Sequence, residues 1–281
     1  MSEMRGAYLD FSDKRGEDGL RVRGERIAFR VASSMTQTPG TMSVKAYGLN
    51  EREKGWIEKR AHTVRLSAGE YGREGLLGVG QVVSASERLT NEGRVMELTA
   101  VDGDDFYAMP VNRSISGNIS LLELVREMVA LCGQSAGIGH ISPIAGQILL
   151  PRGMAVVGTV IPVMRSVAKQ LNAAFYVNQG LVYIVRPEER IGPEVTLYAE
   201  DMLSDAVRDG YWMKISHRMA PHIRVGGSVV MPYMMGEASY RVQKIMAEGD
   251  TRGAVWKMEI EAAAQTAAGL AQSAVTDNVW R

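Results

Sequence analysis

The sequence predicts an α+β protein that is mainly β, with a small α/β unit inserted between two antiparallel β units. Apolar and polar residues alternate with period two over most of residues 25–110 and again within 211–262, as they do in half-buried strands. Between these regions, from Ser120 onwards, apolar residues recur with helical spacing. The chain has 281 residues, 46% of them hydrophobic and 23% charged, which is enough for one large or two smaller cored domains.

The first β unit is predicted from its strands and one short helix. Alternation is clearest in three segments, residues 26–31, 41–47 and 63–68. Asn50 followed by Glu53 forms a capping box, which predicts a helix ending near Lys59. Two more strands are predicted at 76–88 and 94–102, and the Thr90-Asn91-Glu92-Gly93 sequence between them is typical of a hairpin turn.

The middle of the chain predicts helices and a hairpin. Ser120 and Glu123 form a second capping box, for a helix that ends by Gly133. Its predicted buried face consists of Leu121, Leu124, Val125, Met128 and Val129. We expect a strand at 147–150. A second helix should then start with Thr159 as its cap and carry Val163, Val167, Ala168 and Leu171. Residues 174–185 should fold back through Asn178-Gln179-Gly180.

Strand patterns return in the last third of the chain. They cover residues 211–216, 228–231, 240–246 and 254–262, with Pro221, Gly226-Gly227 and residues 249–253 between them. The tail is rich in Ala, Gln and Thr and predicts a frayed helix or disorder. The predicted domains are therefore residues 1–110, 111–190 and 191–262, followed by a tail at 263–281.

Composition limits the kind of partner and compartment. Lys plus Arg and Asp plus Glu both number 32, so bulk charge favours neither nucleic acid nor an anionic membrane. The single cysteine, Cys132, excludes an intramolecular disulfide, lies next to an apolar stretch and is expected in the core. We expect no secretion signal and no membrane span, and the cysteine count is compatible with a reducing cytoplasm.

The sequence offers few residues for catalysis or metal binding. His217 and His222 are separated by a segment containing Pro221, so a helix that aligns both imidazoles on a metal is not expected. The Asp102-Gly103-Asp104-Asp105 segment could be a hydrolase acid pair or a calcium loop, but a strand-ending turn is favoured. We predict no catalytic, cofactor-binding or metal-binding residues, and hence a protein that is not an enzyme.

The most specific stretch is a predicted hairpin over residues 240–261. Gly249 and Gly253 should permit turn dihedrals, Asp250 should accept from the amide two residues on, and Trp256 should anchor the returning strand. With Thr251, these are the predicted structural residues of the turn.

This hairpin resembles the C-terminal hairpin of phage tail baseplate hub proteins, the tail-tube-like hubs related to late control protein D. Three further segments are similar to that family: residues 219–229, residues 151–158 with the hairpin at 175–184, and the N-terminal strands around 47–50. Together they cover most of residues 25–262.

The resemblance implies two tail-tube-like antiparallel β-barrel domains per chain and a homotrimer that adapts a six-fold tail tube to a three-fold spike. Implied partners are the tail tube or distal tail protein, the central spike, the baseplate wedges and the tape-measure protein. DNA would pass through the lumen without specific binding during genome ejection. No cofactor is implied. The protein would belong to the virion baseplate and be assembled in the host cytoplasm.

Two other functions remain open from the sequence. A baseplate-associated hydrolase of cell wall or glycan would use Asp102, Asp104 or Asp105 as acid and base. A barrel-type binder of single-stranded nucleic acid would need aromatic and basic residues interleaved on one strand face, and only residues 211–214 approach that pattern.

Overall fold

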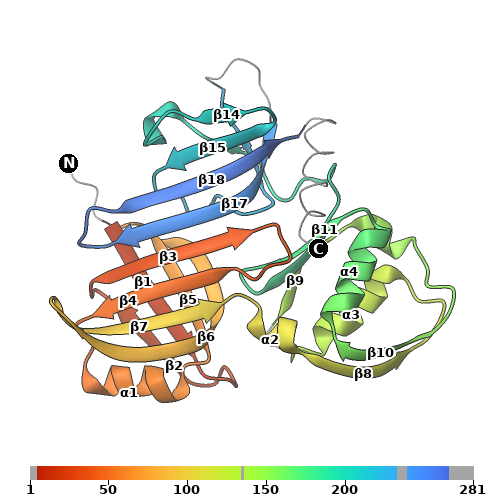
Figure 1. The fold of residues 1–281 in the computed structure, drawn as a ribbon, viewed down its shortest axis with the longest axis horizontal. Helices are drawn as coiled ribbons and strands as arrows, with labels where there is room; N and C mark the ends of the chain where they lie inside the picture. Colours follow the sequence, from red (N-terminus) through yellow and green to blue (C-terminus); the bar gives the residue numbers. More distant parts are fainter. Residues whose placement is uncertain (1–4, 134–135, 233–238, 266–281) are drawn as a thin grey trace.

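The structure is a computed structural model that describes residues 5–133, 136–232 and 239–265. It is mainly β, and most strand pairs are antiparallel, which confirms the predicted fold class. Figure 1 shows a large β part and, beside it, a smaller part that contains helices α3 (Leu121–Ala130) and α4 (Ile161–Gln170). In the described part of the chain, no helix is long and apolar enough to cross a membrane.

Thirteen strands pair into one sheet that contains both β units. Its main path runs β14-β15-β18-β17-β3-β4-β7-β6-β5-β1-β2, and β16 joins β13 to β17 beside this path. The first unit supplies β1 (Arg5–Ser12), β2 (Gly19–Arg23), β3 (Ile27–Ser34), β4 (Thr41–Tyr47), β5 (Thr63–Glu70), β6 (Gly75–Thr90) and β7 (Gly93–Val101). The second supplies β13 (Val195–Thr196), β14 (Val207–Asp209), β15 (Trp212–His217), β16 (Ser228–Val230), β17 (Ser239–Asp250) and β18 (Trp256–Ala264).

The two units meet where β17 pairs with β3, in a register from Lys244 opposite Ser34 to Asp250 opposite Ala28. Within the first unit, β6 is long enough to pair with β5 along its first half and with β7 along its second half. Among the described strands the pairing is an open path, and the closure of two separate barrels stays a prediction.

The inserted part has its own hydrophobic core. It contains β8 (Pro110–Ile115), α3, β9 (Gly137–Ile141), a 3₁₀ turn η2 (Pro143–Gly146), β10 (Met154–Thr159), α4, β11 (Ala174–Asn178) and β12 (Leu181–Val185). Leu121, Met128, Met164 and Phe175 are fully or almost fully buried in this core, which is distinct from the core of the large sheet. A short helix, α2 (Asp104–Ala108), leads from β7 into it, and a second 3₁₀ turn, η3 (Ala199–Asp201), follows β13. The exact domain limits stay a prediction.

The two predicted helix caps and the predicted hairpin turn of the inserted part are present in the structure. Helix α1 (Glu51–Arg60) starts with the Asn50–Glu53 capping box, and α3 starts with the box of Ser120 and Glu123. The turn between β11 and β12 has positive φ at Gln179 and Gly180, as a type I′ hairpin requires. Cys132 is buried, as expected.

Several predicted elements are wrong at the ends of the inserted part. Residues 147–150 form no strand, since Leu149 makes only one bridge, to Ser120. Thr159 does not cap α4: it ends β10, and the N-cap position is Val160, without a side-chain hydrogen bond. Pro162 supplies the helical φ of the first turn instead.

Some strand positions also differ from the prediction. Strands β1 and β2 lie before residue 25, where no strand is predicted, and residues 263–264 belong to β18 rather than to a tail. Of the rest of the predicted tail, Gln265 follows β18 without regular structure, and residues 266–281 lie outside the described residues.

Candidate functional site

The predicted hairpin turn lies where the two β units join. Residues 251–255 connect β17 to β18, and the tip extends the pairing with β3. The Thr251 amide donates to the Ile27 carbonyl oxygen at 3.1 Å, and the Ile27 amide donates to Thr251 Oγ1 at 3.1 Å. Asp250 accepts from the amide of Arg252 at 2.9 Å, the contact that its spacing predicts. The tip is therefore fixed both internally and to β3.

An ion pair strengthens this junction. Arg26, just before β3, donates to the Asp250 carboxylate from Nε at 3.1 Å and from Nη2 at 2.8 Å. Its Nη1 donates to Glu92 at 2.9 Å, and its guanidinium lies 4.5 Å from the centre of the Tyr47 ring. Burial raises the pKa of Asp250, but Arg26 and the amide of Arg252 outweigh this effect, so the pKa is lowered from its ordinary value. Asp250 is thus a partly buried anion held by Arg26.

Trp256 packs against both β1 and β3. Its ring meets Phe29 edge to face, with centroids 5.6 Å apart, and the Arg5 guanidinium lies 5.6 Å from the Trp256 ring centre. Arg5 Nη1 also donates to the Gly253 carbonyl oxygen at 2.5 Å. Residues from both ends of the chain therefore hold the hairpin.

The reason for the two turn glycines differs from the sequence prediction. Neither Gly249 nor Gly253 has positive φ, and Gly249 belongs to β17 rather than to the turn. A Cβ at Gly249 would lie 2.6 Å from the Phe29 ring and 2.7 Å from Trp256. One at Gly253 would lie 2.6 Å from the Asp250 carboxylate. Both positions lack room for a side chain.

A second junction joins the first β unit to the inserted hairpin β11–β12. Asp102, directly after β7, is 6% exposed, and its two carboxylate oxygens accept from the backbone amides of Gly180 and Gln179 at 2.7 and 2.5 Å. Burial raises the pKa of Asp102 from 3.8 to about 6, although both amide hydrogen bonds oppose this rise. Asp102 therefore caps the turn of another part of the chain.

This position leaves little support for an acid pair. Both oxygens of Asp102 are occupied, Asp104 is exposed at the start of α2, and Asp105 pairs with His62 Nε2 at 2.8 Å. In residues 5–133, 136–232 and 239–265, no three His, Cys, Asp or Glu side chains are placed to hold a metal ion. The favoured reading of residues 102–105, a strand-ending turn, matches their place between β7 and α2.

Comparison with known proteins identifies the fold. No protein-family model matches the chain, and no curated protein matches its sequence. A tail protein of 43 kDa from prophage MuSo2 of Shewanella oneidensis matches with a TM-score of 0.64 over 95% of this chain and 98% of that one, at 11% identity. The chain has the fold of phage tail proteins. The tail-protein resemblance found in the sequence is thereby confirmed at the level of fold.

Two further structures share this tail-protein fold. A tail protein from Neisseria meningitidis matches with a TM-score of 0.59 and 9% identity, over 92% of this chain and 96% of that one. An Escherichia coli component of the type VI secretion system, described as similar to bacteriophage T4 tail proteins, matches with a TM-score of 0.58 and 7% identity. That match covers 86% of this chain and 74% of the other.

Sequence reasoning missed most residues that hold this tail-protein fold together at its junctions. It found the turn containing Asp250 but not Arg26, its partner 224 positions away, nor Arg5. It considered Asp102 only as part of an acid pair, a calcium loop or a turn. The sequence held only a weak signal for the Asp102 contact. Asp102 comes directly after a strand, and the tight Asn-Gln-Gly turn 77 residues later has backbone amides that need acceptors.

Proposed function

We propose that this protein is a structural subunit of a phage tail baseplate and forms the hub between tail tube and central spike. The observation that carries the proposal is the fold match with the Shewanella prophage tail protein, which extends over almost the full length of both chains. The likeness to a secretion-system component described as similar to phage T4 tail proteins supports the same class of contractile or tail-like assembly.

The arrangement of the junctions suits a mechanical role. Strand pairing, the Arg26–Asp250 ion pair and the Trp256 contacts join the two β units at several points. The Asp102 hydrogen bonds attach the inserted part. Such a chain would transmit force from tube to spike as one body.

The subunit would assemble as a homotrimer through its sheet edges. Strands β2 and β14 end the main path of the sheet, and each has one paired neighbour on that path. Among the described strands, these two therefore have a partner on one side only, and sheet edges of this kind are paired or covered in stable assemblies. The trimer would contact the tail tube or distal tail protein, the central spike and the wedges, with the tape-measure protein and DNA passing through its lumen.

The test is the native mass of the purified protein by light scattering, with negative-stain images of the same sample. A trimer would have a mass of about 92 kDa, three times the 30.7 kDa chain, and three-fold rings should appear. The control is the same sample diluted through the concentration range, because an obligate trimer keeps its mass. A monomer that also forms no ring when mixed with a tail spike protein would refute the hub role.

A further inference from the structure

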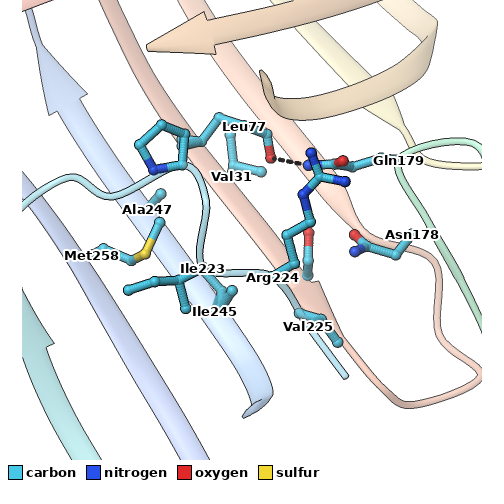
Figure 2. A pocket seen from close by; sticks show the side chains of 12 residues that line it. Val31, Leu77, Asn178, Gln179, Ile223, Arg224, Val225, Ile245, Ala247 and Met258 are labelled. Atoms are coloured by element: carbon cyan, nitrogen blue, oxygen red, sulfur yellow. Dashed lines mark hydrogen bonds between the residues drawn. The ribbon is translucent and has the colours of Figure 1, made fainter. Parts of the chain in front are cut away.

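Two cavities share residues 223–225 as part of their walls. The smaller cavity, shown in Figure 2, measures about 20 Å³, which is room for one or two water molecules. The larger cavity measures about 330 Å³ and lies within the size range of pockets that bind small molecules, roughly 300–1,000 Å³. The larger cavity therefore has room for at least one large side chain from a further segment.

The larger cavity is mainly apolar and reaches the surface. It lies between the residues that lead into β13 and those that lead into β16, and Pro193 and His222 in its wall are exposed. Most of the described side chains that line it are apolar: Ile191, Pro193, Val195, Ile223, Val225 and Val229. Apolar walls in contact with water are unfavourable, and such hollows mark places where apolar groups bind. We therefore expect an apolar occupant.

The last described residue, Gln265, is fixed at the edge of this cavity. Its backbone amide donates to the Ser239 carbonyl oxygen at 2.8 Å, and its side-chain oxygen accepts from Ser239 Oγ at 2.9 Å. Its side-chain Nε2 donates to Ser228 Oγ at 3.1 Å. Ser228 is the first residue of β16 and also lines the larger cavity. Residues 266–281 therefore continue the chain from the edge of the cavity.

The length and composition of residues 266–281 suit this cavity. An extended chain advances at most about 3.6 Å per residue, so Leu270, five positions after Gln265, can lie up to about 18 Å from it. The segment has only two charged residues, and its large apolar residues are Leu270, Val275, Val279 and Trp280. Because the segment is joined directly to Gln265, its effective concentration at the cavity is on the order of millimolar. Contacts of a few apolar side chains then suffice to hold it.

We propose that the larger cavity is the docking site of the chain's own C-terminal segment, residues 266–281, with Leu270 in contact with its walls. The segment covers an apolar hollow that would otherwise be open to other proteins. This contact does not depend on the proposed hub function, because the cavity and its occupant belong to one chain.

The test is hydrogen–deuterium exchange, followed by mass spectrometry, of the 281-residue chain and of a chain that ends at Gln265. If the segment is docked in about nine of ten molecules, amides in 191–195 and 222–229 that open only in the undocked state exchange about tenfold more slowly in the longer chain. Peptides from β4 serve as the internal reference and should exchange equally in both chains. L270D in the longer chain should remove most of the protection. The matched control L89D makes the same change at a leucine that is 82% exposed, and it should leave the protection unchanged.

A synthetic peptide of residues 266–281 provides the second measurement. Added to the shorter chain, it should restore slow exchange in 191–195 and 222–229 in a saturable way, and the same peptide with L270D should not. Equal exchange of these residues in the two chains overturns the proposal. Protection that grows with protein concentration also overturns it, because the occupant is then a second copy. If the β4 reference exchanges faster in the shorter chain, L270D against L89D decides, and equal exchange in these two variants overturns the proposal.

Discussion

Asp102 should make the stability of the protein depend on pH in a direction opposite to most carboxylates. Its pKa in the folded protein is about 6, against an ordinary value of 3.8, because burial disfavours the charged form. The folded state therefore binds this proton more tightly than the unfolded chain does. The contribution of Asp102 to stability is greatest below about pH 4 and is lost as the pH rises through 6.

The magnitude follows from the two pKa values. A shift of about two pKa units corresponds to about 3 kcal/mol over the full range, in favour of the protonated form. Between about pH 4.5 and about pH 7.5, the linkage relation gives a loss of about 2 kcal/mol. Asp102→Asn removes the titrating group while keeping its shape, and it retains one acceptor for the amides of Gln179 and Gly180.

The assay is urea unfolding of the wild type and of D102N at a series of pH values. Other carboxylates titrate in both proteins, so the difference between the two free energies of unfolding isolates Asp102. Relative to D102N, the wild type should lose about 2 kcal/mol of unfolding free energy as the pH rises from about 4.5 to about 7.5. A difference between D102N and the wild type that does not change with pH would refute the assignment of a buried, proton-binding carboxylate.

Three further perturbations test the junctions and the core. Gly249→Ala should lower the free energy of unfolding in urea by about 1–3 kcal/mol, because its Cβ would contact the rings of Phe29 and Trp256. The control Gly55→Ala lies at an open helical position and should raise that free energy by about 0.5–1 kcal/mol. Equal effects of the two substitutions would contradict the steric explanation. Arg26→Met should lower the midpoint of urea unfolding, because it leaves the Asp250 carboxylate without its positive partner. Adding D250N removes that uncompensated charge and should restore part of the loss. If the double variant shows no recovery, the ion pair does not stabilise the junction. Cys132, whose thiol pKa is raised to about 11 by burial and then by Asp105, should react with a thiol reagent at neutral pH only after unfolding, as a colorimetric time course would reveal.

Local signals predicted much of this fold because they depend on residues close together in the sequence. The Asn50–Glu53 and Ser120–Glu123 boxes and the Gln179-Gly180 turn each involve residues within one turn of structure, and all three are present. The wrong cap at Thr159 also has a local cause. Thr159 is a plausible capping residue, but Pro162 in the first turn sets the start of α4 after Val160 instead. Strands β1 and β2 were missed because their surroundings are rich in charge and glycine, and their pairing with each other and with β5 gives them their order.

The glycines show why the candidate site could be located from the sequence but not explained by it. A glycine serves either where φ is positive or where no Cβ fits, and the two uses look the same in a sequence. At Gly249 the turn reading was natural, yet the limiting atoms belong to Phe29, 220 positions earlier, and to Trp256. Gly78 and Gly80 in β6 are of the same type, since a Cβ at each would lie 3.1 Å from Val31 and Ala100, respectively.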